Sequence, residues 1–156
     1  MVGVGNPLRS DDAVGLHVAR RLRESLACDP QVAVEEQWAG GLRLAEAMAG
    51  YDRAVVVDAI EDPAAPPGTL RRLELGDLGS ARNLACAHDT SLPSALAVWR
   101  ALGLPLPAAV AVWGIVAADT DTLSEALTDA VARAVPAAAA AILEELRADS
   151  APGVRP

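Results

Sequence analysis

A pair of adjacent carboxylates follows a glycine-rich turn near the start of the chain. Residues 3–15 have the sequence GVGNPLRSDDAVG, in which Asp11 and Asp12 form the acidic pair. Glycines allow tight backbone turns, and a turn of this kind after a strand usually offers free helix N–H groups to a phosphate. Because two negative charges at that position would repel a phosphate, the segment favours a cation as its ligand.

Two further residues could complete a cation site. Asp58 follows the apolar run Val55–Val57, where a charged side chain is costly to bury unless it is paired or ligates a cation. It could instead accept hydrogen bonds from backbone N–H groups at the strand end. His88 lies in a loop directly before an expected helix, and it could equally be a solvated or hydrogen-bonded side chain. Two carboxylates and one imidazole suit nickel or zinc with open coordination positions, and such a cation can polarise a carbonyl or activate water.

Two other residues could in principle ligate a metal. His17 lies in the middle of an expected helix, beside its polar face, which disfavours it as a ligand. Cys86 precedes His88 by two residues and could ligate a soft metal, but packing in the core suits it better. Cys28 and Cys86 are too few for a disulfide scaffold, so both are expected to be small buried thiols.

The opening segment has an alternative interpretation as a dinucleotide-binding fingerprint, G-x-G-x-x-G after a strand. Its first two glycines fit, and Glu35 or Glu36 could be the acid that binds the ribose. However, Leu8 replaces the third glycine, Pro7 lies inside the turn, and the carboxylates stand where the pyrophosphate would bind. The fingerprint is therefore the weaker interpretation.

Strand and helix patterns alternate along the chain. Residues 54–60 and 108–116 are continuously apolar, which is typical of strands buried on both faces. The expected strands are 1–4, 31–37, 54–60, 69–75 (an edge strand) and 108–116, and the expected helices are 14–27, 42–48, 91 or 93 to 102, and 128–147. This order predicts an α/β fold, a three-layer α/β/α sandwich with a mainly parallel sheet of about five strands.

The expected topology places the candidate ligands together. Ligands of such sheets bind beyond the carboxyl ends of the strands, so Asp12, Asp58 and His88 should converge at that edge. Ser10 or Asp11 is expected to cap the helix that begins at residue 14. Pro136 is expected to kink or break the last helix.

The length, apolar content and charge of the chain favour a single domain that neither spans a membrane nor binds nucleic acid. The 156 residues suit one domain at 1–148, followed by a flexible tail at 149–156. No apolar run approaches the length of a membrane span, and a signal peptide is not evident, so we expect a cytoplasmic protein. A net charge of −8 without a basic face disfavours nucleic acid as a partner. The first strand has only Met1 and Val2 before Gly3, so either it is short or the natural start lies upstream.

These segments resemble the [NiFe]-hydrogenase maturation proteases. Members of that family open with G-x-G-N-x-L-x-x-D-(D/E)-x-x-G, matched here by GVGNPLRSDDAVG. An apolar strand ending in Asp-Ala is matched by VVVDAI, and a loop histidine before an amphipathic helix is matched by HDTSLPSAL. Residues 38–40 (Trp-Ala-Gly) and 113–115 (Trp-Gly-Ile) match two shorter family features. The resemblance extends from residue 3 to about residue 147.

The resemblance implies that Asp12, Asp58 and His88 are the catalytic and metal-contacting residues, with Asp12 where the family often has glutamate. It implies an endopeptidase that removes the C-terminal extension of the [NiFe]-hydrogenase large-subunit precursor after nickel insertion. The substrate could supply the nickel, and zinc or cadmium could replace it in vitro. Either a metal-activated water or a carboxylate base would attack the peptide bond. A non-catalytic, nickel-binding or chaperone-like maturation factor is the alternative from another class.

Overall fold

The computed structural model describes residues 1–38, 40–76, 78–84 and 90–150. Within these residues, five strands form one sheet in the order β2-β1-β3-β5-β4. The strands are β1 (Val2–Val4), β2 (Glu35–Gln37), β3 (Arg53–Ile60), β4 (Leu70–Leu73) and β5 (Ala109–Val116). The helices are the 3-10 helix η1 (Ser10–Ala13) and the α-helices α1 (Val14–Ser25), α2 (Gly41–Ala47), α3 (Leu92–Ala101) and α4 (Asp129–Ser150).

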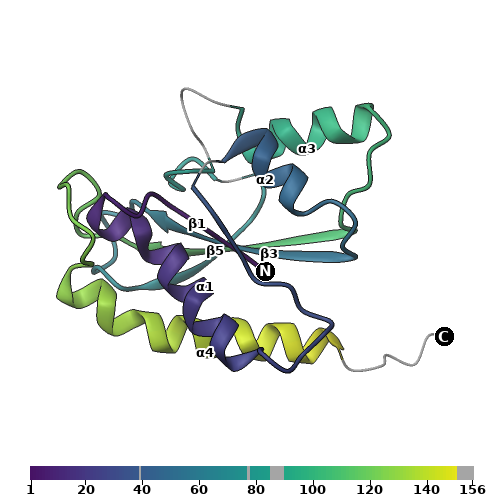
Figure 1. Cartoon of the computed structure of the whole chain (residues 1–156). Helices are drawn as coiled ribbons and strands as arrows, with labels where there is room; N and C mark the ends of the chain where they lie inside the picture. Colours follow the sequence, from purple (N-terminus) through teal and green to yellow (C-terminus); the bar gives the residue numbers. More distant parts are fainter. Residues whose placement is uncertain (39, 77, 85–89, 151–156) are drawn as a thin grey trace.

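The sheet lies between two helix layers. Strands β1, β2, β3 and β5 pair in parallel, whereas β4 pairs antiparallel with β5 at the edge. Helices α1 and α4 cover one face of the sheet, and α2 and α3 cover the other (Figure 1). The predicted three-layer α/β/α sandwich with a mainly parallel, five-stranded sheet is therefore confirmed.

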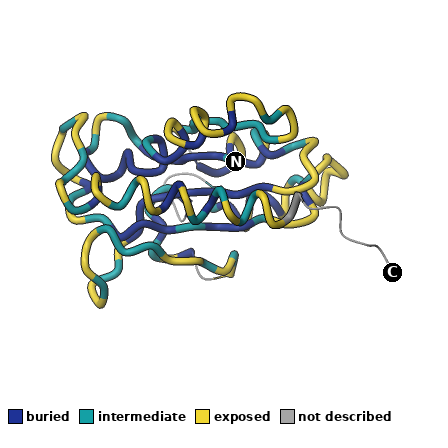
Figure 2. Tube along the Cα trace, turned by 90° about the horizontal axis from the view of Figure 1, so that it is seen from below, coloured by how far each residue is buried: buried dark blue, intermediate teal, exposed yellow. Residues whose placement is uncertain are grey.

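The two faces of the sheet are filled by alternating apolar side chains. In β3, Val55 and Val57 pack with α1 and α4, while Val56 packs with the layer of α2 and α3. The predicted apolar stripe of α1 is buried as well, since Leu16 and Leu22 are both inaccessible to solvent. Figure 2 shows the buried residues concentrated in the central strands and along the inner sides of the helices.

Close contact between β1 and α1 explains the glycines of the opening motif. A β-carbon on Gly3 would collide with the carbonyl oxygen of Gly15, and one on Gly15 would collide with that of Val4. Gly5 has a positive φ of 156°, and a β-carbon there would meet the carbonyl oxygen of Asp12. These three glycines let the start of α1 lie directly against the end of β1, which places Asp12 at the carboxyl end of the sheet.

Some element limits differ from the prediction. Strand β2 is shorter than residues 31–37, because β1 provides strand partners only for Glu35–Gln37. Helix α4 continues through Pro136 to Ser150, so it reaches into the predicted tail and Pro136 does not break it. The division into a domain at 1–148 and a tail at 149–156 stays a prediction, and residues 151–156 lie outside the described part. In the described ranges, none of the helices combines the length and apolar character that crossing a membrane requires.

Candidate active site

Asp12 and Asp58 meet near the carboxyl ends of the central strands. Asp58 lies in β3 and is fully buried, and Asp12 lies in η1 with only 3% of its surface exposed. The side chain of Asn83 joins them, because its Nδ2 group donates to Asp12 Oδ1 at 3.0 Å and to Asp58 Oδ1 at 2.8 Å. The structure therefore brings together two of the three predicted site residues. The third, His88, lies outside the described residues.

From groups in the described part of the chain, the carboxylate of Asp58 accepts four hydrogen bonds. Oδ1 accepts from the amide of Asn83 and from the backbone N–H of Ala59 at 2.9 Å. Oδ2 accepts from the backbone N–H groups of Asn83 at 2.8 Å and Leu84 at 3.2 Å. An ionised carboxylate has about four acceptor positions, so all of them are used. The backbone hydrogen bonds considered as an alternative for Asp58 are thus present, and a cation that reaches Asp58 must displace a donor.

Asp12 is less completely hydrogen-bonded. Its Oδ2 accepts the backbone N–H of Asn6 at 3.2 Å, and its Oδ1 lies 3.9 Å from Nε of Arg82. Arg82 also pairs with Glu61 and Asp121, both at 2.8 Å, so its charge is shared among three acids. Because the carboxylate of Asp12 already accepts an N–H group of the glycine-rich turn, that turn is poorly suited to a phosphate, which argues against the dinucleotide interpretation.

Burial changes the protonation of both acids. Desolvation, together with the negative charge of Asp12, raises the pKa of Asp58 to about 7 against the hydrogen bonds from Asn83 and Ala59. Desolvation also raises the pKa of Asp12, against the Asn83 hydrogen bond and the attraction of Arg82. Two adjacent carboxylates with raised pKa values can hold and release a proton near neutral pH, which is the chemistry of a general acid and base.

Asp11, the neighbour of Asp12, holds two distant segments in place. Its carboxylate accepts hydrogen bonds from the backbone N–H groups of Ala118 and Asp119, at 2.9 and 3.1 Å. It also accepts from the backbone N–H of Thr128 at 2.7 Å and from its hydroxyl at 2.9 Å. Asp11 therefore fastens the loop after β5 and the start of α4 to η1.

The prediction that Ser10 or Asp11 caps α1 is wrong. The residue that precedes α1 is Ala13, and α1 has no side-chain cap, because η1 comes first and both polar side chains turn to the 117–128 segment. The hydroxyl of Ser10 donates to the carbonyl of Ala126 at 3.2 Å. Ser10 also has a positive φ of 42°, which is uncommon for a residue with a side chain.

Neither His17 nor Cys28 forms a metal-ligand group with this pair among the described residues. His17 lies in α1, and its pKa is lowered by burial and by the nearby Arg20, with Glu36 acting in the opposite direction. Cys28 is exposed and free, so the prediction of a buried thiol there is wrong; it follows the end of α1, in a turn at the surface. Cys86 lies outside the described residues.

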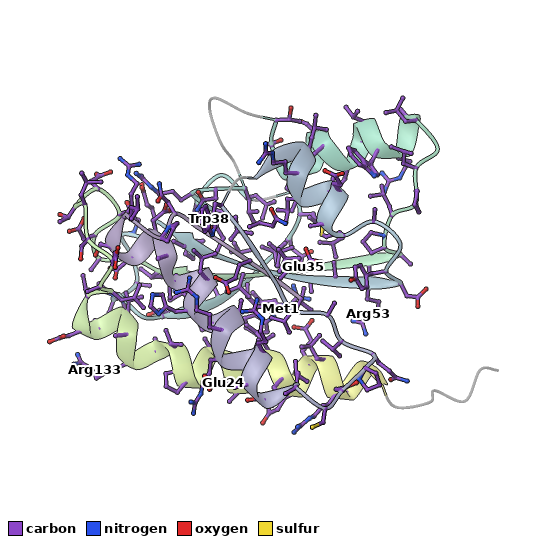
Figure 3. All side chains as sticks on the ribbon, viewed as in Figure 1. Met1, Glu24, Glu35, Trp38, Arg53 and Arg133 are labelled. Carbon is purple, nitrogen blue, oxygen red and sulfur yellow. The ribbon has the colours of Figure 1, made fainter. Side chains whose placement is uncertain are left out.

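Exposed apolar side chains surround the turn that contains Asp12. Leu8, Trp38 and Leu123 are 55%, 69% and 82% exposed. Backbone hydrogen bonds join their segments, from Gly5 N–H to the carbonyl of Gln37 at 3.1 Å and from Ser124 N–H to the carbonyl of Leu8, also at 3.1 Å. In Figure 3, Trp38 lies toward the end of the sheet where α1 begins, away from Arg53. We call Leu8, Trp38 and Leu123 the apolar rim.

Cavities occur at both ends of the sheet. A cavity of about 530 Å³ lies at the amino ends of the strands, where Met1, Tyr51 and Arg53 line it. A smaller one of about 210 Å³ lies beside the carboxyl ends of β3 and β5, lined by Glu61 and residues 117–121. The larger cavity is therefore remote from the carboxylate pair, and the smaller one lies next to the site, where Arg82 holds Glu61 and Asp121.

The side chains of this site provide only some of the ligands that a divalent cation needs. Among the described residues, no three His, Cys, Asp or Glu side chains are grouped closely enough to hold a metal ion. Asp12 and Asp58 nevertheless present two carboxylate oxygens to a single point, which Asn83 Nδ2 now fills. Carboxylate oxygens are suitable ligands for zinc and related divalent cations. The two acids can therefore supply part of a ligand set once the Asn83 amide moves aside.

Comparison with known proteins identifies the family. The family model "HycI: Hydrogenase maturation protease" matches residues 16–145, most of the chain. This chain belongs to the hydrogenase maturation protease family. The Hydrogenase 2 maturation protease of Escherichia coli (strain K12) is 27% identical over 104 residues, which are 66% of this chain and 63% of that protein. The chain thus matches less than two thirds of the length of that relative.

Solved structures of the family have the same fold. The hydrogenase maturating endopeptidase HybD from E. coli superimposes with a TM-score of 0.74 at 24% identity, covering 96% of this chain and 91% of that one. The [NiFe] hydrogenase maturation protease HybD from Thermococcus kodakarensis gives a TM-score of 0.64 at 26% identity, covering 93% and 95%. The matching folds support the family assignment made from the sequence.

Asn83 is the site residue that sequence reasoning missed. The segment Arg82-Asn83-Leu84 has no motif of its own, and an asparagine in a loop is usually a turn residue. The one signal in the sequence is that Asn83 precedes His88 by five residues.

Proposed function

We propose that this protein is an endopeptidase that removes the C-terminal extension of the [NiFe]-hydrogenase large-subunit precursor after nickel insertion. Membership of the maturation protease family supports the reaction class. The observation that best supports the site is the buried carboxylate pair Asp12 and Asp58, joined by one amide at the carboxyl edge of the sheet. Paired acids in such a position suit peptide hydrolysis, which needs a proton acceptor and a proton donor.

The proposed chemistry makes the ionised acid of the pair the general base and the protonated acid the general acid. With the pKa of Asp58 raised to about 7, one of the two acids keeps its proton near neutral pH while the other is ionised. The ionised acid would accept a proton from the attacking water, and the protonated acid would donate one to the leaving amine. In the alternative mechanism, nickel in the substrate would meet Asp12, Asp58 and His88 as additional ligands, and a bound cation, rather than a carboxylate base, would activate the water.

The proposed substrate is a protein chain, and it needs a surface to bind. The apolar rim of Leu8, Trp38 and Leu123 provides exposed apolar area next to the acids. Large exposed apolar side chains grouped at one site are typical of protein-binding surfaces. We therefore propose that the apolar rim binds the precursor chain on either side of the cleaved bond.

The free, exposed thiol of Cys28 suits a reducing compartment such as the cytoplasm.

Cleavage of a purified precursor tests this function. The protein is mixed with nickel-loaded large-subunit precursor, and the products are measured by mass spectrometry. We expect wild-type protein to release one defined C-terminal peptide, and Asp12→Ala to slow release by at least about 100-fold, the effect of losing an acid–base group. Glu24→Ala is the matched control, because Glu24 is exposed on α1 and pairs only with Arg21 among the contacts described.

Three outcomes of this assay are informative. Release of no peptide by the wild-type protein, together with binding of the nickel-loaded precursor, would favour the chaperone-like alternative. Equal rates for wild-type protein and Asp12→Ala would contradict the role of the carboxylate pair. A slow rate for Glu24→Ala would show that loss of any acid on the helix affects the assay, and the site assignment would fail.

A further inference from the structure

Asn83 Nδ2 lies between the two carboxylates. The amide group has two hydrogens, and each is directed at one acid, Asp12 Oδ1 at 3.0 Å or Asp58 Oδ1 at 2.8 Å. Both distances are those of ordinary hydrogen bonds. A neutral donor of two hydrogen bonds thus holds the two acids together in a buried site.

A cation that bridged the same oxygens would need the same place. Asp12 and Asp58 would hold such a cation through the carboxylate oxygens that now accept from the amide, and carboxylate oxygens are ligands that zinc and related cations take. We propose that Asn83 is a positioning residue whose amide competes with a divalent cation for Asp12 and Asp58. The proposal deepens the proposed function, on which it rests, by saying how the metal-free site is held together and what the substrate's metal must displace.

The backbone around Asn83 is fixed, which leaves its side chain as the part that moves. Three successive N–H groups donate to β3, from Arg82 to the carbonyl of Ala59 at 3.0 Å and from Asn83 and Leu84 to Asp58. On the other side, a β-carbon on Gly40 would collide with the carbonyl oxygen of Asn83, so that segment packs closely against it. Rotation of the side chain alone would free one acceptor position on Asp12 Oδ1 and one on Asp58 Oδ1, while Asp58 keeps its hydrogen bonds from the backbone N–H groups of Ala59, Asn83 and Leu84.

Calorimetric titration of the protein with nickel chloride, without precursor and at constant pH, tests the competition. Asn83→Ala removes the amide and leaves both acids, so we expect it to bind Ni²⁺ about ten-fold more tightly than wild-type protein, equal to about 1.4 kcal/mol. Thr128→Val is the matched control, because it also removes one donor to a buried carboxylate, that of Asp11. We expect its affinity for Ni²⁺ to equal that of the wild type.

Thermal melting provides the second readout. Asn83→Ala should melt at a lower temperature than the wild type without metal, and Ni²⁺ should raise its melting temperature more than that of the wild type. Asn83→Asp, which keeps the size of the side chain, should melt lower still because three acids then repel one another, and Ni²⁺ should restore it. This second variant keeps the test decisive if Asn83→Ala fails to fold.

The proposal is overturned if Asn83→Ala binds Ni²⁺ no more tightly than the wild type, including the case in which neither binds. It is also overturned if Ni²⁺ leaves the melting temperature of both variants unchanged, as it would for a residue that only holds the fold. Failure here would leave precursor cleavage by wild-type protein unaffected. Failure of cleavage with tighter Ni²⁺ binding by Asn83→Ala would instead contradict the proposed function alone.

Discussion

Asp11 and Asp58 are both fully buried, and each carboxylate accepts four hydrogen bonds, yet their surroundings differ in one respect. The donors of Asp11 come from the loop after β5 and from Thr128 at the start of α4. One donor of Asp58 is shared with a second acid, since the Asn83 amide also bonds Asp12. The number of hydrogen bonds therefore does not separate a structural carboxylate from a candidate catalytic one, whereas a donor shared with a second acid does.

This comparison predicts a large loss of stability at Asp11. Asp11→Ala leaves three backbone N–H groups and the Thr128 hydroxyl, all partly buried, without their acceptor. We expect the free energy of unfolding to fall by about 3 kcal/mol, since each of the four lost hydrogen bonds contributes about 0.5–1.5 kcal/mol. Urea denaturation at pH 7 measures the change. A loss below about 1 kcal/mol would mean that water replaces the carboxylate and that Asp11 does not fasten the two segments.

The comparison also shows which parts of the site the sequence could predict. The convergence of Asp12 and Asp58 follows from local patterns, because an apolar strand and a glycine-rich turn both end at the carboxyl edge of a parallel sheet. The role of Asp11 depends on residues more than a hundred positions away, and that of Asn83 on the path of a loop. Neither can be inferred from local spacing, which is why Asp11 was expected to cap α1.

Local sequence patterns likewise predict some elements of the fold and not others. The apolar runs at 54–60 and 108–116 predicted the central strands, because burial on both faces leaves a continuous pattern. The length of β2 depends on its neighbour instead, since β1 pairs with it only over three residues. Its sequence alone therefore suggested a longer strand.

The raised pKa of Asp58 predicts a dependence of stability on pH. The unfolded carboxyl loses its proton near 3.8 and the folded one near 7, so between these values the folded protein binds more protons than the unfolded chain. The free energy of unfolding should therefore fall as the pH rises from 4 to 7, at up to about 1.4 kcal/mol per pH unit.

Urea denaturation across this pH range, for the wild type and Asp58→Asn, measures the effect. The variant lacks the titrating group, so its stability should fall less steeply than that of the wild type. Equal slopes would show that Asp58 ionises near its ordinary pKa in the folded protein, and the proposed division of acid and base roles would lose its support.

The smallest expected effect concerns the apolar rim. Trp38→Ala should raise the KM for precursor about five-fold or more with little change in kcat, because truncating an exposed aromatic anchor weakens binding. Leu102→Ala is the matched control, since Leu102 is similarly exposed but follows α3, near the opposite end of the sheet. Steady-state rates of peptide release over a range of precursor concentrations give both constants. An unchanged KM for Trp38→Ala, or an equal increase for Leu102→Ala, would remove the rim as the substrate surface.

The central claim is that the Asp12 and Asp58 pair performs the reaction while Asp11 supports the fold. The most direct test compares Asp58→Asn with Asp11→Asn, each at the same concentration of folded protein, in cleavage of nickel-loaded precursor followed by mass spectrometry. Both variants replace a buried acid that accepts four hydrogen bonds. We predict that Asp11→Asn releases the C-terminal peptide at nearly the wild-type rate and that Asp58→Asn releases none. Equal rates for the two variants would contradict the account.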